Sequence, residues 1–503
     1  MTEKQLIINV NLAETRIALL ENGNMAEIFI ERVHDQGIVG NIFKGIVTRV
    51  LPGMNSAFVD IGLDKSAFLF GGDVWDPEHE KTALSLSEDG DDKKLADKRP
   101  IEKVLRDGQE IIVQVAKEPL GTKGPRVTMY QTIPGRFLVL MPNFSHIGIS
   151  RRIEQEEERE RLKQIVEGMV PEGAGVIIRT AAIGVEEEVL QKDLAYLIKL
   201  WHQLEKAISV SRPPSLLHKD LDVVQKVTRD LYSHDINNII IDDHDTYDQL
   251  GSFLKATIPG AYQKLSLYTD QTPIFDVYGV EIDIGRALGE RVELPSGGYL
   301  IIEQTEALTS FDVNTGRFVG KANARHTILS TNIEAAKKVV EQLRIRNIGG
   351  IIIVDFIDME DPVDRELIYD TLLEELKADR ARTNVLRVSE LGLVQMTRKR
   401  TSESLERRLL TACPFCDGKG SIRSTETEAY DLLREIHRHH IQTGCTKMKV
   451  RVRPEIREWI EKKGREFFEQ LKNLYQIDVK FEKTQLNQIL LREPAYEVWS
   501  DNE

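Results

Sequence analysis

The segment "NIGGIIIVDFIDM" (347–359) constrains the fold more than any other stretch of the chain. Four consecutive aliphatic residues, Ile351–Val354, follow a Gly-Gly pair and end at Asp355. An uninterrupted run of this length is typical of a strand buried within a sheet. The segment therefore predicts a sheet-based domain in which a carboxylate stands at the far end of a buried strand.

A second segment, "LPSGGYLIIEQTEALTSFDVNTGRFVG" (294–320), predicts two further strands that follow a Gly-Gly turn. Asp312 and Asn314 are two positions apart, so their side chains share one face of the strand. Carboxylates on two strands, Asp312 and Asp355, suit magnesium, which keeps several waters, one of which can attack a phosphodiester. Asn314 cannot act as a base, but it can donate a hydrogen bond to the phosphate. The alternative is that both aspartates only cap strand ends.

Composition sets the wider limits. A chain of 503 residues with 41% hydrophobic and 29% charged residues is ordinary globular material with room for several domains. No stretch approaches the roughly 18 apolar residues of a membrane span, and the N-terminus lacks a basic leader, so a cytoplasmic protein is expected.

The net charge of −14 argues against nonspecific coating of nucleic acid, so a polyanion must be bound by local basic groups.

The N-terminal part predicts a hairpin followed by a small β-barrel. Residues 4–32 alternate around an "ENGN" turn, and residues 39–70 and 108–130 contain short strands punctuated by Gly and Pro. The acidic stretch 73–100 between these blocks is expected to be a long surface loop.

Aromatic and basic residues in this barrel suggest a surface for RNA. Phe58 and Phe68 could stack on bases while Lys117 and Lys123 bind phosphates, although composition alone favours a place in the core for both phenylalanines. The segment "GNIFKGIVTRVLPGMNSAFVDIGLDKSAFL" resembles the opening of an S1-type RNA-binding domain.

Two further segments carry polar residues at strand ends. The strand "GVIIRT" ends on Arg179 and Thr180, which could hold a phosphate or could simply be solvated. The carboxylates of "DDHD" (242–245) follow "NIII" and are interpreted as a strand exit and helix cap, not as a nuclease site.

The segment "TACPFCDGKGS" (411–421) is typical of a metal knuckle. Cys413 and Cys416 supply two thiolates, whereas structural zinc usually takes four ligands, and the remaining cysteine, Cys445, stands alone. Glycines follow the pair at once, which favours a metal over a redox CxxC at a helix N-terminus. The histidines of the later helix are expected to be surface residues: His437, His439 and His440.

Four motifs in order, "LPSGGYLIIEQTEALTSFDVNTG", "NIGGIIIVDFIDM", "DRAR" (379–382) and "CPFCDGKG", closely resemble the ribonuclease E/G family of bacterial endoribonucleases. The resemblance runs from residue 4 to about residue 425. Because the chain ends at 503 without a long tail, the ribonuclease G branch is expected.

The resemblance implies an α/β multidomain (α+β) fold. An RNase H-like domain is interrupted by an S1-type OB barrel and a 5′ sensor, and is followed by a DNase I-like catalytic domain, a zinc link and a small α/β domain. These parts are expected at residues 1–38 and 215–278 for the RNase H-like domain, 39–128 for the barrel with its acidic insertion 73–100, 129–214 for the sensor, 279–408 for the catalytic domain, 409–424 for the zinc link and 425–503 for the small domain.

The resemblance also implies roles for matching residues. Asp312 and Asp355 would bind the catalytic magnesium, and Asn314 would position the scissile phosphate. Single-stranded RNA would be bound by Phe58, Phe68, Lys117 and Lys123, and a 5′-monophosphate end by Gly135, Val139, Arg151, Arg179, Thr180 and Arg382. One zinc would be shared between Cys413 and Cys416 of two subunits, giving a homodimer, with a homotetramer as a further option.

The activity implied is that of a magnesium-dependent endoribonuclease. It would cleave single-stranded, A/U-rich RNA with 5′-monophosphate stimulation, leave 5′-phosphate and 3′-hydroxyl ends, and act in rRNA processing and mRNA decay. One departure is Gln395, where the family pattern has a glutamate. The alternative is a non-catalytic S1-type RNA-binding protein with a structural zinc, and a thiol oxidoreductase is a weaker third.

Overall fold

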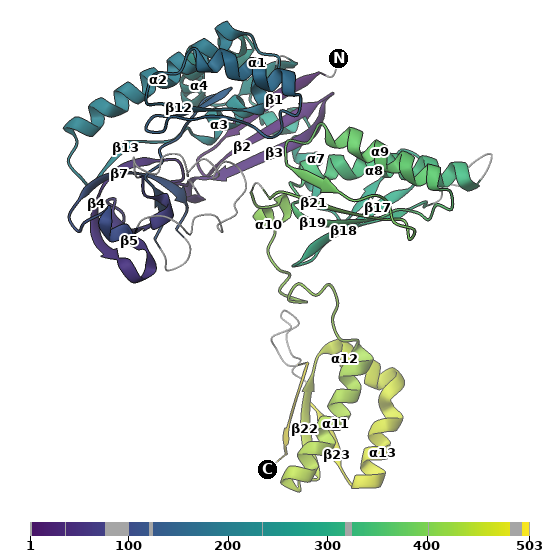
Figure 1. The fold of residues 1–503 in the computed structure, drawn as a ribbon. Helices are drawn as coiled ribbons and strands as arrows, with labels where there is room; N and C mark the ends of the chain where they lie inside the picture. The colour runs from purple at the N-terminus through teal and green to yellow at the C-terminus, as the bar shows by residue number, and fades with distance from the viewer. Residues whose placement is uncertain are drawn as a thin grey trace. The chain divides into compact units, whose positions relative to one another are not determined.

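The chain divides into two compact units, Met1–Ser404 and Leu405–Glu503 (Figure 1). The computed structural model describes residues 3–35, 37–75, 100–119, 124–233, 235–316, 324–400, 402–482 and 495–501. Most of the predicted acidic loop therefore lies outside the described residues, as does Lys123. Among the described residues, no helix is long and apolar enough to cross a membrane.

A five-stranded sheet opens the first unit and joins two distant parts of the chain. Its order is β15-β14-β1-β2-β3, with β1 parallel to β14 and antiparallel to β2. The strands are β1 (Lys4–Val10), β2 (Glu14–Glu21), β3 (Asn24–Arg32), β14 (Ile236–Ile241) and β15 (Leu265–Leu267), and the helices beside them are α3 (Val223–Leu231), α4 (His244–Thr257), α5 (Pro259–Tyr262), α6 (Ile274–Val277) and α7 (Val280–Ala287). Segments 1–38 and 215–278 thus contribute to one sheet.

The "DDHD" residues behave as the sequence predicts. Asp243 caps α4 by accepting a hydrogen bond of 2.8 Å from the backbone N–H of Thr246. Asp242 accepts one of 2.8 Å from the backbone N–H of Val10 at the end of β1. The interpretation of this run as a strand exit and helix cap is confirmed.

The small barrel predicted from the sequence is also confirmed. Five strands pair in the order β4-β5-β6-β8-β7, and β7 pairs with β4 to close the ring. Their bounds are β4 (Ile42–Leu51), β5 (Ser56–Asp60), β6 (Ala67–Phe70), β7 (Glu110–Lys117) and β8 (Arg126–Thr128), and β13 (Ser215–His218) pairs with β4 as well. Alternate residues such as Val47, Val59 and Val113 fill the interior.

A four-stranded sheet with two helices follows the barrel. Its order is β11-β12-β10-β9, and a continuous apolar core lies between the sheet and the helices. The elements are β9 (Ile133–Pro134), β10 (Leu138–Met141), β11 (Ile147–Ile149), α1 (Glu156–Glu167), β12 (Gly175–Ile178) and α2 (Glu187–Val210).

A six-stranded sheet completes the first unit, in the order β16-β17-β18-β19-β21-β20. Two helices pack on one of its faces (Figure 1), where Phe311, Ile352 and Val354 are buried. The elements are β16 (Arg291–Glu293), β17 (Tyr299–Gln304), β18 (Leu308–Asn314), α8 (Ala324–Ile345), β19 (Gly350–Asp355), α9 (Pro362–Leu376), β20 (Thr383–Val385) and β21 (Leu393–Arg398).

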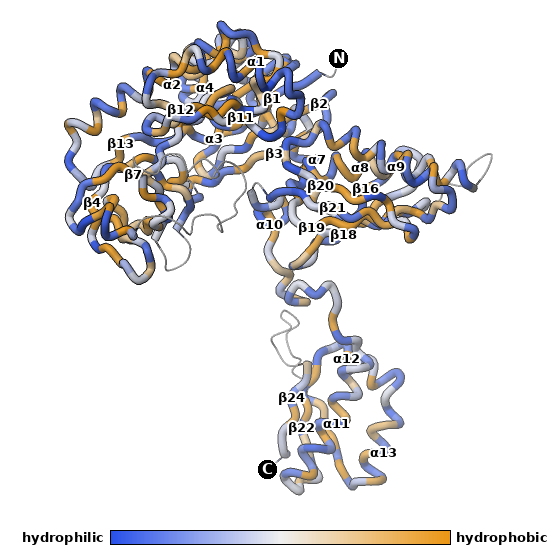
Figure 2. Tube along the Cα trace, in the orientation of Figure 1, coloured by the Kyte–Doolittle hydropathy of each residue, from blue (hydrophilic) through white to orange (hydrophobic). Residues whose placement is uncertain are grey.

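The apolar run of β19 is buried on one side only. Ile352 and Val354 face the helices, whereas Ile351 is 51% exposed. The prediction of a fully buried strand is wrong for Ile351, because these helices pack on a single face of the sheet. Figure 2 shows how hydrophobic residues follow β18 and β19 along the trace.

The second unit is a small α/β domain with a three-stranded sheet in the order β23-β22-β24. Leu432, Ile436, Met448 and Val450 form the centre of its core. Its elements are α10 (Leu405–Leu409), α11 (Thr425–Thr443), β22 (Lys447–Val452), α12 (Pro454–Trp459), α13 (Arg465–Tyr475), β23 (Asp478–Phe481) and β24 (Tyr496–Ser500).

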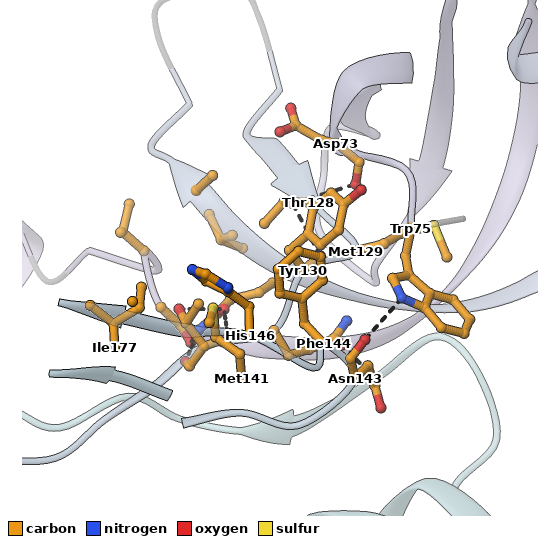
Figure 3. A pocket seen from close by; sticks show the side chains of 18 residues that line it. Asp73, Trp75, Thr128, Met129, Tyr130, Met141, Asn143, Phe144, His146 and Ile177 are labelled. Atoms are coloured by element: carbon orange, nitrogen blue, oxygen red, sulfur yellow. Dashed lines mark hydrogen bonds between the residues drawn. The ribbon is translucent and has the colours of Figure 1, made fainter. Parts of the chain in front are cut away.

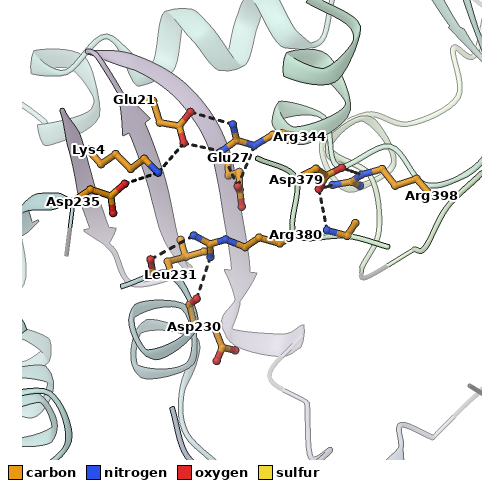
Figure 4. A network of polar contacts seen from close by, with 11 residues as sticks. Lys4, Glu21, Glu27, Asp230, Leu231, Asp235, Arg344, Asp379, Arg380 and Arg398 are labelled. Carbon is orange, nitrogen blue, oxygen red and sulfur yellow. Dashed lines mark hydrogen bonds and ion pairs between the residues drawn. The ribbon is translucent and has the colours of Figure 1, made fainter. Parts of the chain in front are cut away.

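Within the first unit, Arg344 ties α8 to the five-stranded sheet (Figure 4). Its guanidinium donates to Glu21 at 2.9 Å and to Glu27 at 3.0 Å, and its side chain is 9% exposed. Burial acts to raise the pKa of Glu21, but the hydrogen bond and charge of Arg344 outweigh it and lower that pKa. Arg344 thus pairs with two carboxylates, and Glu21 has a second, longer contact of 3.7 Å with Lys4.

We expect Arg344→Met to destabilise the first unit by about 3 kcal/mol at pH 7, because it removes the buried cation that pairs with Glu27 and Glu21, and Glu21 keeps only the longer contact of 3.7 Å with Lys4. Since the folded-state pKa of Glu21 is lowered, the stabilisation it contributes is present above its ordinary pKa and is lost as the pH falls through the lowered value. The difference in unfolding free energy between Arg344→Met and the wild type should therefore be smaller at acidic pH. Thermal unfolding at pH 7 and pH 4 measures both effects.

Arg286→Met is the matched control. Arg286 is an exposed arginine of α7 that pairs with Asp283 one turn away. Exposed pairs of this kind contribute about 0–1 kcal/mol. Equal losses in the two variants would contradict the role assigned to Arg344.

Candidate active site and nucleic-acid interface

The six-stranded sheet brings two predicted site residues together. Strands β18 and β19 run parallel, and Asp312 is the direct register partner of Asp355. Both side chains lie on the face opposite the helices and are exposed. Residues far apart in the sequence thus form one carboxylate pair at the carboxyl ends of adjacent strands.

Asn314 belongs to the same cluster. Its side-chain Nδ2 donates a hydrogen bond of 2.8 Å to Oδ2 of Asp312. Burial raises the pKa of Asp355, and the negative charges of Asp312 and Asp358 raise it further. The two carboxylates therefore repel each other, and a cation between them would relieve that repulsion.

This donor set fits magnesium. Magnesium takes one or two protein carboxylates and fills its remaining positions with water and substrate oxygens. Within the part of the chain that the structure describes, no group of three or more His, Cys, Asp or Glu side chains is placed to hold a metal. The carboxylate pair of Asp312 and Asp355 is thus suited to a magnesium ion that shares its coordination with water.

Arg179 and Thr180 stand at the end of β12, where the sequence predicts a phosphate site. Nη1 of Arg179 donates to the carbonyl of Gly135 at 2.6 Å, and Nη2 donates to Oδ1 of Asp230 at 2.9 Å. The hydroxyl of Thr180 lies 3.1 Å from that of Ser150, the residue before Arg151. Four of the six predicted sensor positions, Gly135, Arg151, Arg179 and Thr180, are therefore neighbours in the fold.

The other two predicted sensor residues lie nearby in the fold. Val139 of β10 pairs in register with Ile177 of β12. Arg382 belongs to the segment "DRAR", whose Arg380 donates to the carbonyls of Asp230 and Leu231 at 3.2 and 3.4 Å (Figure 4). This segment of the six-stranded sheet domain therefore reaches the end of α3, next to Arg179.

Asp193 is a functional candidate that the sequence predictions omit. Its buried carboxylate accepts hydrogen bonds from the backbone N–H groups of Arg136, Phe137 and Leu138 at 2.9–3.2 Å. Burial raises the pKa of Asp193. A Cβ atom at Gly135 would come within 2.7 Å of this carboxylate, so glycine is required there. The signal in the sequence is an aspartate among the buried leucines of α2.

The barrel carries a groove of about 940 Å³ that is lined by three of the four predicted RNA-binding residues, Phe58, Phe68 and Lys117, while Lys123 lies outside the described residues. Phe58 and Phe68 meet edge to face with ring centroids 6.0 Å apart, and Phe58 is 36% exposed. The alternative that both rings are core is therefore wrong for Phe58. The described residues of the groove also include Lys65, which follows Phe58 in the same segment, and two arginines that the sequence did not indicate, Arg49 and Arg126.

A second cavity of about 470 Å³ lies between the barrel and the four-stranded sheet (Figure 3). Aromatic side chains line it, and several polar groups there are already used inside the protein. Trp75 donates its Nε1 to the carbonyl of Asn143 at 3.0 Å, and the Tyr130 hydroxyl donates to the carbonyl of Val74 at 3.2 Å. Among the predicted site residues that the structure describes, none lines this cavity.

In the knuckle of the second unit, backbone N–H groups lie close to the sulfur atoms of both cysteines. The N–H of Gly420 lies 3.2 Å from Sγ of Cys416, and the N–H groups of Cys416 and Phe415 lower the pKa of Cys413. Gly418 and Gly420 have φ of 79° and 70°, which glycine adopts readily. The pair fits zinc, but it supplies half of a tetrahedral ligand set.

A model of the ribonuclease E/G family matches residues 132–401. The chain belongs to this family. A second model, the RNase E/G thioredoxin-like domain, matches residues 412–498. In the structure Cys413 lies in an irregular segment and Cys416 in the turn that follows it, before α11 and not at a helix N-terminus, which agrees with a metal knuckle better than with a redox pair.

Curated relatives agree with this assignment. The chain is 47% identical over 454 residues to ribonuclease G of Escherichia coli (strain K12), covering 90% of this chain and 91% of that protein. It is 46% identical to ribonuclease G of Haemophilus influenzae over 462 residues, covering 92% of each. Ribonuclease E of a Nostoc species is 39% identical over 407 residues, covering 80% of this chain and 57% of that protein.

We expect Asp312→Asn to lower the pKa of Asp355, because the substitution removes one of the two negative charges that raise it. The pKa should stay above its ordinary value, since burial and Asp358 remain. A pH titration of carboxyl carbon chemical shifts by NMR measures it. Asp245→Asn, on the exposed side of α4, should leave it unchanged. An Asp355 titration unaffected by Asp312→Asn would contradict the pairing.

Proposed function

We propose that the protein hydrolyses single-stranded RNA at the exposed face of the six-stranded sheet, leaving 5′-phosphate and 3′-hydroxyl ends. Membership of the ribonuclease E/G family supports an endoribonuclease. The observation that carries the location is the register of β18 and β19, which pairs Asp312 with Asp355 on that face beside Asn314.

Each residue of this cluster has a definite task. Asp312 and Asp355 would hold a magnesium ion, which when bound would supply Lewis-acid stabilisation of phosphate charge and a more acidic water. The Asn314 amide has two N–H donors, and one already binds Asp312, which fixes the orientation of the group. Its second N–H can therefore donate to the scissile phosphate as charge develops.

The barrel groove is the proposed binding surface for the unpaired RNA strand. Phe58 presents part of its ring to the groove beside Phe68, and stacking on aromatic rings accepts any base. Lys117 and Arg49 lie in the same groove and supply positive charge for phosphates in a protein of net charge −14. A/U-rich stretches are the proposed targets because they stay unpaired most readily.

The end of β12 is the proposed sensor of a 5′-monophosphate. Arg179 offers charge-assisted donors, and Thr180 offers a hydroxyl one residue later. We propose that this sensor accepts a triphosphate less well, because a triphosphate is bulkier than a monophosphate. Stimulation by 5′-monophosphate ends suits an enzyme of rRNA processing and mRNA decay, which is the role we propose.

We expect Asp355→Asn to reduce RNA cleavage by roughly 10³-fold, the size typical of losing a group that stabilises charge in the transition state. RNA binding should change little, since the barrel groove is intact. Gel-based cleavage assays with magnesium and filter binding of the same oligonucleotide measure the two quantities. Asp245→Asn serves as the charge-matched control.

The outcomes separate catalysis from simple RNA binding. Full cleavage by Asp355→Asn would remove the proposed site. Absence of magnesium-dependent cleavage in the wild-type enzyme, with RNA binding retained, would instead favour a non-catalytic RNA-binding protein.

The knuckle is the proposed basis of a homodimer. Cys413 and Cys416 give two of the four ligands that structural zinc takes, and within the described residues no third ligand is grouped with them. The same pair from a second copy of the chain would complete the site. A zinc ion bound there would cross-link two subunits.

We expect zinc at half the protomer concentration, because two chains would share one ion. Cys416→Ser should lose both the metal and the larger assembly, whereas Cys445→Ser should keep both. Elemental analysis and light scattering give these values. One zinc per protomer would contradict the shared site.

A further inference from the structure

Asp230, at the end of α3, accepts three hydrogen bonds from two arginines. Its Oδ1 accepts from Nε of Arg229 at 2.9 Å and from Nη2 of Arg179 at 2.9 Å. Its Oδ2 accepts from Nη2 of Arg229 at 3.1 Å. Burial raises the pKa of Asp230, but the two arginines outweigh it and lower that pKa, so the carboxylate is charged at neutral pH.

Arg179 therefore already holds an anion of its own chain. One of its terminal nitrogens donates to the Gly135 carbonyl and the other to Asp230. Carboxylate and phosphate oxygens are both acceptors for the guanidinium fork. A 5′-phosphate that approaches Arg179 must share or replace the contact with Asp230.

Asp230 is also held in place without Arg179. Arg229 is 9% exposed and binds both carboxylate oxygens, while its Nη1 donates to the Pro134 carbonyl at 2.9 Å. When a phosphate takes the Arg179 nitrogen, the Asp230 charge stays close by. The resulting repulsion grows with the charge of the 5′ end, which is about −2 for a monophosphate and larger for a triphosphate.

We propose that Asp230 determines the specificity of the 5′ sensor: it competes with the RNA 5′ end for Arg179 and disfavours ends that carry more charge than a monophosphate. The inference rests on the proposed function, in which Arg179 binds the 5′-phosphate. It adds electrostatic selection by a residue outside the predicted sensor set.

Asp230→Asn is the appropriate variant. The amide keeps an oxygen acceptor for Arg229 and removes the negative charge. The bonds from Arg380 reach the backbone carbonyls of Asp230 and Leu231, so the substitution does not involve them. If thermal unfolding shows that Asp230→Asn does not fold, Asp230→Ser is used in its place. This substitution also removes the charge and keeps a small hydrogen-bond acceptor.

The experiment measures kcat/KM of the full chain on one single-stranded RNA oligonucleotide with a 5′-hydroxyl, a 5′-monophosphate or a 5′-triphosphate. In Asp230→Asn the ratio of kcat/KM for the monophosphate substrate to kcat/KM for the hydroxyl substrate should rise by roughly fivefold. This change corresponds to about 1 kcal/mol, the contribution typical of an exposed ion pair. The difference in kcat/KM between the monophosphate and triphosphate substrates should be smaller in Asp230→Asn than in the wild type. Asp245→Asn should leave all ratios at wild-type values.

A double variant shows whether the effect acts through Arg179. In an Arg179→Ala background, Asp230→Asn should have no further effect on the ratios. A monophosphate-to-hydroxyl ratio that stays unchanged or falls in Asp230→Asn would overturn the inference, since Asp230 would then only position Arg179. A wild-type enzyme without any monophosphate preference, or a preference that survives Arg179→Ala, would instead overturn the proposed sensor itself.

Discussion

The parallel pairing of β18 and β19 is the constraint on which the account of this protein depends. It sets Asp312 beside Asp355, although the helix α8 separates the two strands in sequence. Helices pack on one face of the sheet and bury Phe311 and Val354, so alternate residues of the same strands point to the opposite face. Side chains alternate between the two faces of each strand. This alternation both buries the apolar residues that stabilise the domain and exposes the carboxylates.

Sequence reasoning predicted this site because strand periodicity and strand ends are local properties. The two-residue spacing of Asp312 and Asn314 places them on one face, and the structure adds their hydrogen bond. Periodicity could not show that one face of β19 is open, as the exposure of Ile351 demonstrates. That property depends on where α8 and α9 pack, which is decided by contacts between distant parts of the chain.

The residues that the sequence did not indicate are those whose role comes from long-range contacts. Asp193 lies on α2 yet holds the backbone of residues 136–138. Asp230 lies on α3 yet binds Arg179 at the end of β12. An aspartate in a helix is ordinary in sequence, and only the fold shows that Asp193 holds the backbone after Gly135 and that Asp230 pairs with Arg179. The barrel groove is similar, since Arg49 joins Phe58 and Lys117 through strand pairing.

The location of the proposed magnesium ion is the most direct test of the central claim. Crystals of the full chain soaked in manganese, a stand-in for magnesium, would locate the ion by anomalous scattering. We expect one strong peak within about 2.2 Å of carboxylate oxygens of both Asp312 and Asp355. A peak elsewhere, in a protein that cleaves RNA under the same conditions, would show that this carboxylate pair is not the reaction centre.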